Sequence, residues 1–131
     1  MTELSIELSM LLWATILYVV QIFISAGAAD LHHGVAWGLG NREESPAIPG
    51  WAGRAERAYK NMTENLLPFA CLVLIAVASE RLGDLSAMGA QLFVASRVLH
   101  GILYIAGIKV LRSLAYGGGL AGMGMIAAQI L

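Results

Sequence analysis

The chain has 131 residues, of which 58% are hydrophobic and only 13% are charged, and its mean hydropathy is +0.71. This balance excludes an ordinary soluble domain and predicts a single all-α integral membrane domain over residues 1–131. Eight basic and nine acidic residues give a net charge of -1, so the chain lacks the basic excess typical of nucleic-acid-binding proteins. The one cysteine, Cys71, excludes an internal disulfide, and we expect it to be a buried thiol in an apolar helix.

Four apolar segments follow one another along the chain and predict a bundle of four transmembrane helices. The first covers about residues 4–39, and at ~1.5 Å per residue it is long enough to cross ~30 Å of hydrocarbon. Two prolines and a glycine then break the chain within residues 41–50. The other three helices are expected at about residues 51–82, 85–107 and 110–131, with a kink or a freed carbonyl at Pro68 and an N-cap at Asp84.

The second segment carries a polar stripe directly before an apolar run. Arg57, Lys60, Asn61 and Glu64 stand at i, i+3, i+4 and i+7, so they share one face of a helix, and Arg54 extends this face by one turn. Polar residues that enter a bilayer indicate a functional site. Cations, an amide and a carboxylate on one face suit a ligand that carries carboxylates and an ammonium group, such as a small peptide.

Two further polar clusters lie in the last two segments. They comprise Arg97, His100 and Tyr104 in the third segment and Arg112, Ser113 and Tyr116 in the first turns of the fourth. With four spans, the start of the second helix, the end of the third and the start of the fourth lie at one membrane face, so we expect the three clusters to converge there. A cation at a helix N-terminus, with tyrosine hydroxyls nearby, suits an anion such as a thiolate.

Each cluster also has a structural interpretation. Arg97 lies deep in the predicted bilayer, where an ion pair with Glu64 explains both residues as well as ligand contact does. His100 alone is more typical of an interhelical hydrogen bond, and single arginines at the start of a span are typical of interfacial anchors. His32 and His33 point to different faces of a helix, and we expect no metal site.

The distribution of basic residues predicts the orientation in the membrane. Six of them lie in or beside the first and third loops, whereas the second loop has only Arg81. The positive-inside rule therefore predicts that both termini are non-cytoplasmic and that the site faces the cytoplasm. Small residues in the fourth segment, including Gly118 and Gly122, favour close packing of this helix against its neighbours.

Three motifs resemble those of the MAPEG family, the membrane-associated proteins in eicosanoid and glutathione metabolism. They read Arg57-Ala-Tyr-Lys-Asn61-Met-Thr-Glu64-Asn-Leu-Leu-Pro68-Phe69, Arg97-Val-Leu-His100-Gly-Ile-Leu-Tyr104 and Arg112-Ser113-Leu-Ala-Tyr116. The spacing in the first motif is the most specific. The resemblance covers essentially the whole chain and indicates a bacterial-type member that is similar to microsomal glutathione transferases.

The resemblance implies a left-handed four-helix bundle that assembles as a homotrimer, with glutathione as co-substrate between neighbouring subunits near the cytoplasmic face. It implies that glutathione is held by Arg57, Lys60, Asn61, Glu64, His100, Tyr104 and Tyr116. It also implies catalytic roles for Arg112, which would stabilise the thiolate, and for Ser113 and Tyr104. Lys60 stands where some members of the family carry arginine.

The expected function is that of a detoxifying glutathione transferase or peroxidase, in which a thiolate attacks a lipophilic electrophile or hydroperoxide that arrives from the bilayer. In a bacterium the protein would lie in the inner membrane. The main alternative is a non-catalytic lipid-binding or scaffold protein on the same fold. An ion or proton conduit would need a continuous polar path, which the apolar halves of the second and fourth segments do not provide.

Overall fold

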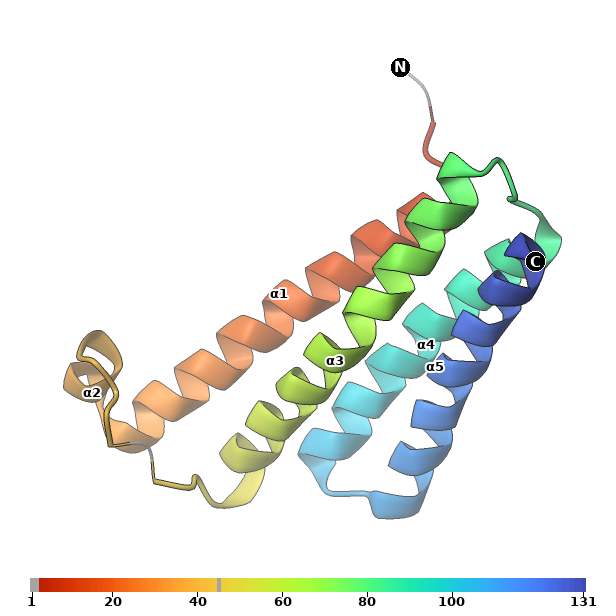
Figure 1. The fold of residues 1–131 in the computed structure, drawn as a ribbon. Coiled ribbons are helices and arrows are strands. Elements are labelled where there is room, and N and C mark those ends of the chain that lie inside the picture. The colour runs from red at the N-terminus through yellow and green to blue at the C-terminus, as the bar shows by residue number, and fades with distance from the viewer. Residues whose placement is uncertain (1–2, 45) are drawn as a thin grey trace.

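The computed structural model describes residues 3–44 and 46–131 and is helical in all its regular elements (Figure 1). The helices are α1 (Ile6–His33), α2 (Val35–Leu39), α3 (Gly50–Ala78), α4 (Asp84–Ala106) and α5 (Lys109–Ile130). Helix α1 begins and helix α5 ends at the same end of the molecule (Figure 1). Helices α4 and α5 pack most extensively against each other, and α1 packs mainly against α3.

Three of the long helices, α1, α3 and α4, are long and apolar enough to cross a membrane. Helix α5 has 22 residues, which at ~1.5 Å per residue corresponds to roughly 33 Å, so it is also long enough. Its most apolar stretch is less hydrophobic than those of the other three, because it contains several glycines. Three membrane-spanning helices therefore follow from length and composition, and the fourth span stays a prediction.

Apolar side chains from all four long helices meet in one core. The closest aromatic contact joins Phe69 of α3 to Phe93 of α4, whose rings are stacked with centroids 3.9 Å apart. The other buried members of this core are Ala14, Met62, Val73, Ala76, Ala90, Met123 and Ile126. Because α3 and α4 meet through two stacked flat rings at this level, this apolar contact helps to fix their relative position.

Small residues allow α4 and α5 to pack closely, as predicted for the fourth segment. Gly89 and Gly122 face each other across this contact, and a Cβ atom on either one would collide with the carbonyl oxygen of the other. A Cβ atom on Gly118 would come equally close to the side-chain oxygen of Ser96. Close backbone approach of this kind is typical of helix pairs in membranes, where dispersion replaces the hydrophobic effect as the driving force.

The first predicted helix, about residues 4–39, is interrupted near its end. It is divided at Gly34, whose φ of 97° and ψ of 153° are not helical, so α1 ends at His33 and α2 is a separate short helix. Only glycine adopts such a conformation readily. The break redirects the chain into α2, and Trp37, Arg42 and residues 46–48 line one end of a cavity between α1 and α3.

The end of α3 and the start of α4 also differ from prediction. Helix α3 stops at Ala78, before the predicted residue 82, and Asp84 is the first helical residue of α4 and not its N-cap. Gly83 is the N-cap, and its backbone N–H donates to Ser86 Oγ at 2.9 Å. The Ser86 hydroxyl donates in turn to Glu7 of α1, and both side chains are buried. This contact joins the beginnings of two spanning helices.

One expectation about α3 needs correction. Cys71 is exposed and not buried, because it lies on the outer face of α3, away from the core residues Phe69 and Val73. Helix α3 contains Pro68 in its interior, and the kink or freed carbonyl expected there stays a prediction. The position of a residue in an apolar run shows that it lies within the membrane, but not whether it faces another helix of the same chain.

Candidate functional site

Six of the predicted site residues line one cavity of about 300 Å³ where α3, α4 and α5 meet, and we call it the inner cavity. The lining residues are Asn61 of α3, His100 and Tyr104 of α4, and Arg112, Ser113 and Tyr116 of α5. All six are polar, although the surrounding helix segments are mainly apolar. The structure therefore brings together members of all three clusters that the sequence places at one membrane face, one from α3, two from α4 and three from α5.

Arg112 is the cation of the inner cavity. Its guanidinium carbon lies 4.3 Å from the centroid of the Tyr104 ring, so a cation–π contact holds the side chain across the gap between α5 and α4. Arg112 is the fourth residue of α5, within the turn where backbone N–H groups have no helical partner. Side-chain charge and helix dipole therefore both favour an anion in this region.

His100 lies between the two tyrosines of the inner cavity. Its ring centroid is 5.5 Å from that of Tyr104 and 6.1 Å from that of Tyr116. The side chain is 2% exposed, and its Nδ1 atom has no hydrogen-bond partner among the described residues. The interhelical hydrogen bond expected for His100 is therefore not formed through this atom. A buried nitrogen without a partner beside a cavity is a position where a bound molecule can supply one.

A hydrogen bond from Arg97 holds the side chain of Asn61 in place. The Arg97 Nη2 atom donates to Asn61 Oδ1 at 2.8 Å, and the Arg97 side chain is 1% exposed. The Asn65 amide also donates to the Asn61 backbone carbonyl at 2.8 Å. Arg97 thus acts through Asn61 and does not line the inner cavity itself. The spacing from Arg97 to His100 singled out Arg97 in the sequence, but no feature of the sequence identified Asn61 as its hydrogen-bond partner.

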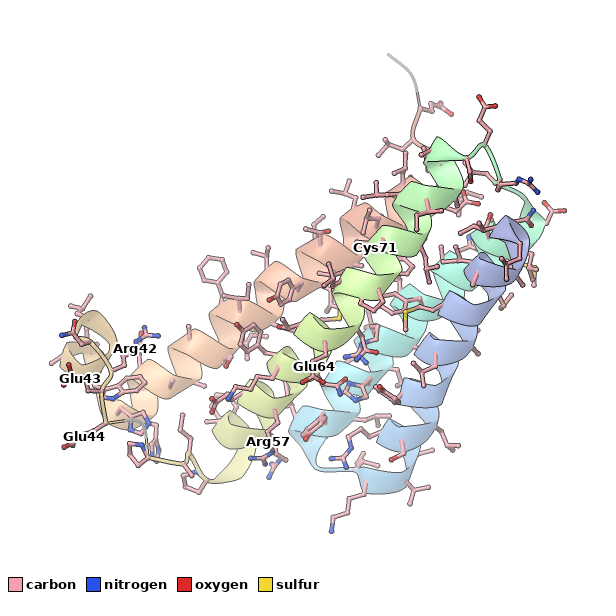
Figure 2. The ribbon with its side chains drawn as sticks, in the orientation of Figure 1. Arg42, Glu43, Glu44, Arg57, Glu64 and Cys71 are labelled. Carbon is pink, nitrogen blue, oxygen red and sulfur yellow. The ribbon has the colours of Figure 1, made fainter. Side chains whose placement is uncertain are left out.

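The predicted ion pair between Arg97 and Glu64 is not formed among the described residues. Glu64 is exposed, and it does not line the inner cavity. Glu64 and Arg57 both lie on α3 (Figure 2), and they stand seven positions apart in the sequence. Asn61 takes the place that we expected for Glu64, because it lies on the side of α3 that faces α4.

Two basic residues of the polar face of α3 have partners within the chain. Arg54 was expected to extend the ligand-binding stripe, but its Nε atom donates to the carbonyl oxygen of Ile105 at 2.9 Å, near the end of α4. This bond satisfies one of the carbonyls that a helix C-terminus leaves without a partner. Lys60 pairs with Glu56 at 2.9 Å within α3. Arg54 is therefore a structural contact between α3 and α4.

A second, larger cavity of about 580 Å³ lies between α1 and the first turns of α3, with Trp37, Arg42 and residues 46–48 at one end, and we call it the outer cavity. Arg57 and Lys60 line the outer cavity and not the inner one, whereas Glu64 lines neither. The polar stripe of α3 is thus divided between two cavities. A stripe of four residues on a helix is wide enough for its members to face two different neighbours.

Comparison with known proteins identifies one family for the chain. No curated protein and no solved structure matches the chain. The model of the MAPEG family matches residues 10–131, which include nearly all of the four long helices and all the residues of the inner cavity. The match covers nearly the whole chain and confirms the resemblance seen in the three polar motifs. The chain therefore belongs to the MAPEG family of membrane proteins.

Proposed function

We propose that the protein is a membrane glutathione transferase, with activity toward lipophilic electrophiles or hydroperoxides. The family includes glutathione transferases and also non-catalytic members, so membership alone does not decide between them. The observation that carries the proposal is the inner cavity, where Arg112, Tyr104 and Tyr116 surround a space beside a helix N-terminus. A non-catalytic scaffold has no need for a cation held in this way.

The donors of the inner cavity fit glutathione. The amide of Asn61 and the unpartnered nitrogen of His100 suit the polar backbone of a small peptide. A volume of about 300 Å³ lies at the lower end of the roughly 300–1,000 Å³ found for small-molecule sites. Glutathione would supply a thiolate as nucleophile.

The chain's own residues would act on the thiolate through charge and hydrogen bonds. Arg112 would stabilise the negative sulfur electrostatically, and the Tyr104 and Tyr116 hydroxyls would donate hydrogen bonds toward it. The Ser113 hydroxyl lies beside Arg112 in the same cavity, where it donates to the carbonyl oxygen of Lys109 at 3.3 Å, and rotation away from this carbonyl would let it donate to a ligand instead. The cation–π contact with Tyr104 limits the freedom of Arg112 before any ligand binds, which reduces the reorganisation needed for reaction.

We further propose a homotrimer in which glutathione lies between neighbouring subunits. Glu64 is exposed on a helix whose composition suits a membrane, and a charged residue at the centre of a span costs roughly 2.5–3.5 kcal/mol on insertion scales. Coverage by a second subunit would remove Glu64 from lipid and let it, with Arg57 and Lys60, reach the same peptide. Native mass spectrometry in mild detergent should show a trimer, and a stable monomer would contradict this assembly.

The proposed orientation places the inner cavity at the cytoplasmic face and both termini on the other side, because the basic residues concentrate in the first and third loops. A topology reporter fused after Leu131 should be active only outside the cytoplasm. Activity of the fusion in the cytoplasm would show the opposite orientation. In the proposed orientation, with the site at the cytoplasmic face, the electrophile would reach it laterally from the inner leaflet.

Titration of the purified protein with glutathione in detergent tests the proposed chemistry. We expect saturable binding together with the ultraviolet absorbance of a thiolate. A model electrophile added to this complex should be conjugated at a rate that saturates with glutathione. Retention of lipids without any binding of glutathione would instead indicate a lipid-binding scaffold on the same fold.

A further inference from the structure

The outer cavity has a chemical character different from that of the inner one. One wall comes from α1, the opposite wall from the first turns of α3, and Trp37, Arg42 and residues 46–48 line the end. The lining residues are Ile22, Ser25, Ala26, Ala29, His33, Trp37, Arg42, Pro46, Ala47, Ile48, Glu56, Arg57, Tyr59 and Lys60. Nothing in the proposed glutathione chemistry requires a space between α1 and α3.

The α1 wall of the outer cavity is apolar at one end. Ile22, Ala26 and Ala29 stand at i, i+4 and i+7, so they form one strip along a helix that is long and apolar enough to span a membrane. Ala29 also packs against Ile48 of the loop. From Ile22 to His33 the cavity follows α1 for eleven residues, which at ~1.5 Å per residue is roughly 16 Å. Its depth therefore extends from the loop well into the apolar part of α1.

The loop end of the outer cavity is basic. Arg42, Arg57 and Lys60 line it, against the single carboxylate of Glu56, which already pairs with Lys60 at 2.9 Å. Arg57 is exposed and makes neither a hydrogen bond nor an ion pair with any described residue. The positive charge of the lining therefore exceeds the negative charge, and an anion would balance it.

The acidic residues next to Arg42 do not reverse this balance. Glu43 and Glu44 follow Arg42 in the same loop and are exposed, as Figure 2 shows, but neither lines the cavity. The backbone carbonyl of Glu44 accepts a hydrogen bond from Trp37 Nε1 at 2.6 Å. The Arg42 guanidinium lies 5.2 Å from the Trp37 ring centroid, so this tryptophan anchors the loop.

The position of Trp37 indicates where the basic end lies relative to the membrane. Tryptophan concentrates at the level of the lipid head groups, because its ring is apolar and its N–H needs a polar partner. Trp37 lies beside Arg42 in the lining, and the apolar strip of α1 extends from there toward the centre of the span. Cations at head-group level above an apolar wall match the two ends of a lipid molecule.

We propose that the outer cavity binds the head group of an anionic phospholipid. Arg42 would contact the phosphate, with Arg57 and Lys60 adding positive charge at the same end of the cavity, and the first methylene groups of an acyl chain would lie against Ile22 and Ala26. Arginine suits phosphate because its planar guanidinium can donate two hydrogen bonds at once. Basic pockets between membrane helices are recurrent sites for anionic lipid head groups. The lipid would tie the loop after α2 to the membrane surface beside the proposed glutathione site.

Native mass spectrometry of the purified full-length chain tests this proposal, with phosphatidylglycerol and phosphatidylcholine as probes. We expect saturable retention of about one phosphatidylglycerol per subunit and clearly weaker retention of phosphatidylcholine. Arg42→Gln should weaken phosphatidylglycerol retention about fivefold, the loss expected for one cation near an anionic lipid. Ala26→Trp should remove retention, because the indole would fill the space beside the apolar wall.

Arg81→Gln is the matched control, because Arg81 is an exposed arginine beyond the opposite end of α3. This variant should retain as much phosphatidylglycerol as the unmodified chain. Glutathione binding is measured on the same samples; Arg42 and Ala26 lie outside the proposed peptide site, so its persistence shows that each variant is folded. If Ala26→Trp does not fold, Arg42→Gln decides.

Three results would overturn the proposal. The first is equal retention of the two lipids, and the second is equal retention by Arg42→Gln and Arg81→Gln. The third is displacement of phosphatidylglycerol by an equal concentration of glycerol phosphate, which would show that the site binds a small phosphate and not a lipid. Failure of lipid retention with glutathione binding intact would leave the transferase proposal standing.

Discussion

The inner and outer cavities lie along the same helix, α3, but they are built differently. In the inner cavity, Asn61 is fixed by the buried Arg97 and His100 is almost fully buried, so the polar groups are positioned by the packing of three helices. In the outer cavity, Arg57 and Lys60 are exposed, and a loop forms one wall. The first arrangement suits chemistry, which depends on fixed geometry, and the second suits binding of a variable amphiphile.

The difference has a physical origin in what each helix can bury. A polar group between packed helices must find a partner, because no water is available to it, and the partner then fixes its orientation. A charged group at the membrane surface keeps its hydration and its side-chain freedom. Substitutions in the inner cavity should therefore have larger and more specific effects than those in the outer one.

The largest expected effect comes from Arg112→Ala. If Arg112 stabilises a bound thiolate, its removal should lower turnover roughly a hundred- to a thousandfold, or ~2.7–4 kcal/mol, while glutathione binding largely persists. Conjugation of a model electrophile and the thiolate absorbance of the complex would both be measured. Lys109→Ala is the control, since it removes a cation from the same turn outside both cavities. A near-normal rate with the thiolate signal intact would reduce Arg112 to an interfacial anchor.

Asn61→Ala should come next, because it affects stability and binding together. The substitution leaves the buried Arg97 guanidinium without the amide that accepts its hydrogen bond, at a cost of ~1.5–3 kcal/mol. The measurements are thermal unfolding in detergent and glutathione affinity. A double-mutant cycle with Arg97→Leu isolates the contact, and additive effects of the two substitutions would show that it does not couple the residues.

Arg57→Ala should have a moderate effect and shows which cavity Arg57 serves. If Arg57 holds a glutathione carboxylate at the subunit boundary, glutathione affinity should fall about tenfold, or ~1.4 kcal/mol, with the saturated rate unchanged, because such a contact acts equally on ground and transition states. Binding and turnover are measured over a range of glutathione concentrations. Unchanged affinity together with loss of phosphatidylglycerol retention would assign Arg57 to the outer cavity alone.

Gly34→Ala should have the smallest effect on activity. The positive φ of Gly34 makes any side chain there unfavourable by ~1 kcal/mol or somewhat more, although a Cβ atom would contact nothing within 4 Å. The strain lies in the turn that leads into α2, whose Trp37 lines the outer cavity. We expect a slightly lower unfolding temperature and normal conjugation activity. A large loss of conjugation would show that the two cavities are coupled through α1.

Much of the fold could be predicted from the sequence. Apolar segments of sufficient length predicted the long helices, and for α4 and α5 the predicted boundaries lie within one residue of those observed. The small residues of α5 predicted its close packing. The errors lie at Gly34, at the end of α3 and at Gly83, where backbone conformation or a capping contact with Ser86 decided the boundary. Apolar pattern carries little information at such positions, because it does not depend on the local φ and ψ angles.

The sequence by itself determined that the chain is a membrane protein and which polar residues share a face of each helix, because composition and helical periodicity depend on residue order alone. Only the tertiary structure decided the partner of each face. Rotation of α3 against α4 gave Arg97 the amide of Asn61 in place of Glu64, and it directed Arg54 to the carbonyl of Ile105. The same packing left Arg57 beside α1 and Cys71 on the outside. Helix rotation depends on the fit of whole surfaces, such as Phe69 against Phe93, and no single motif specifies it.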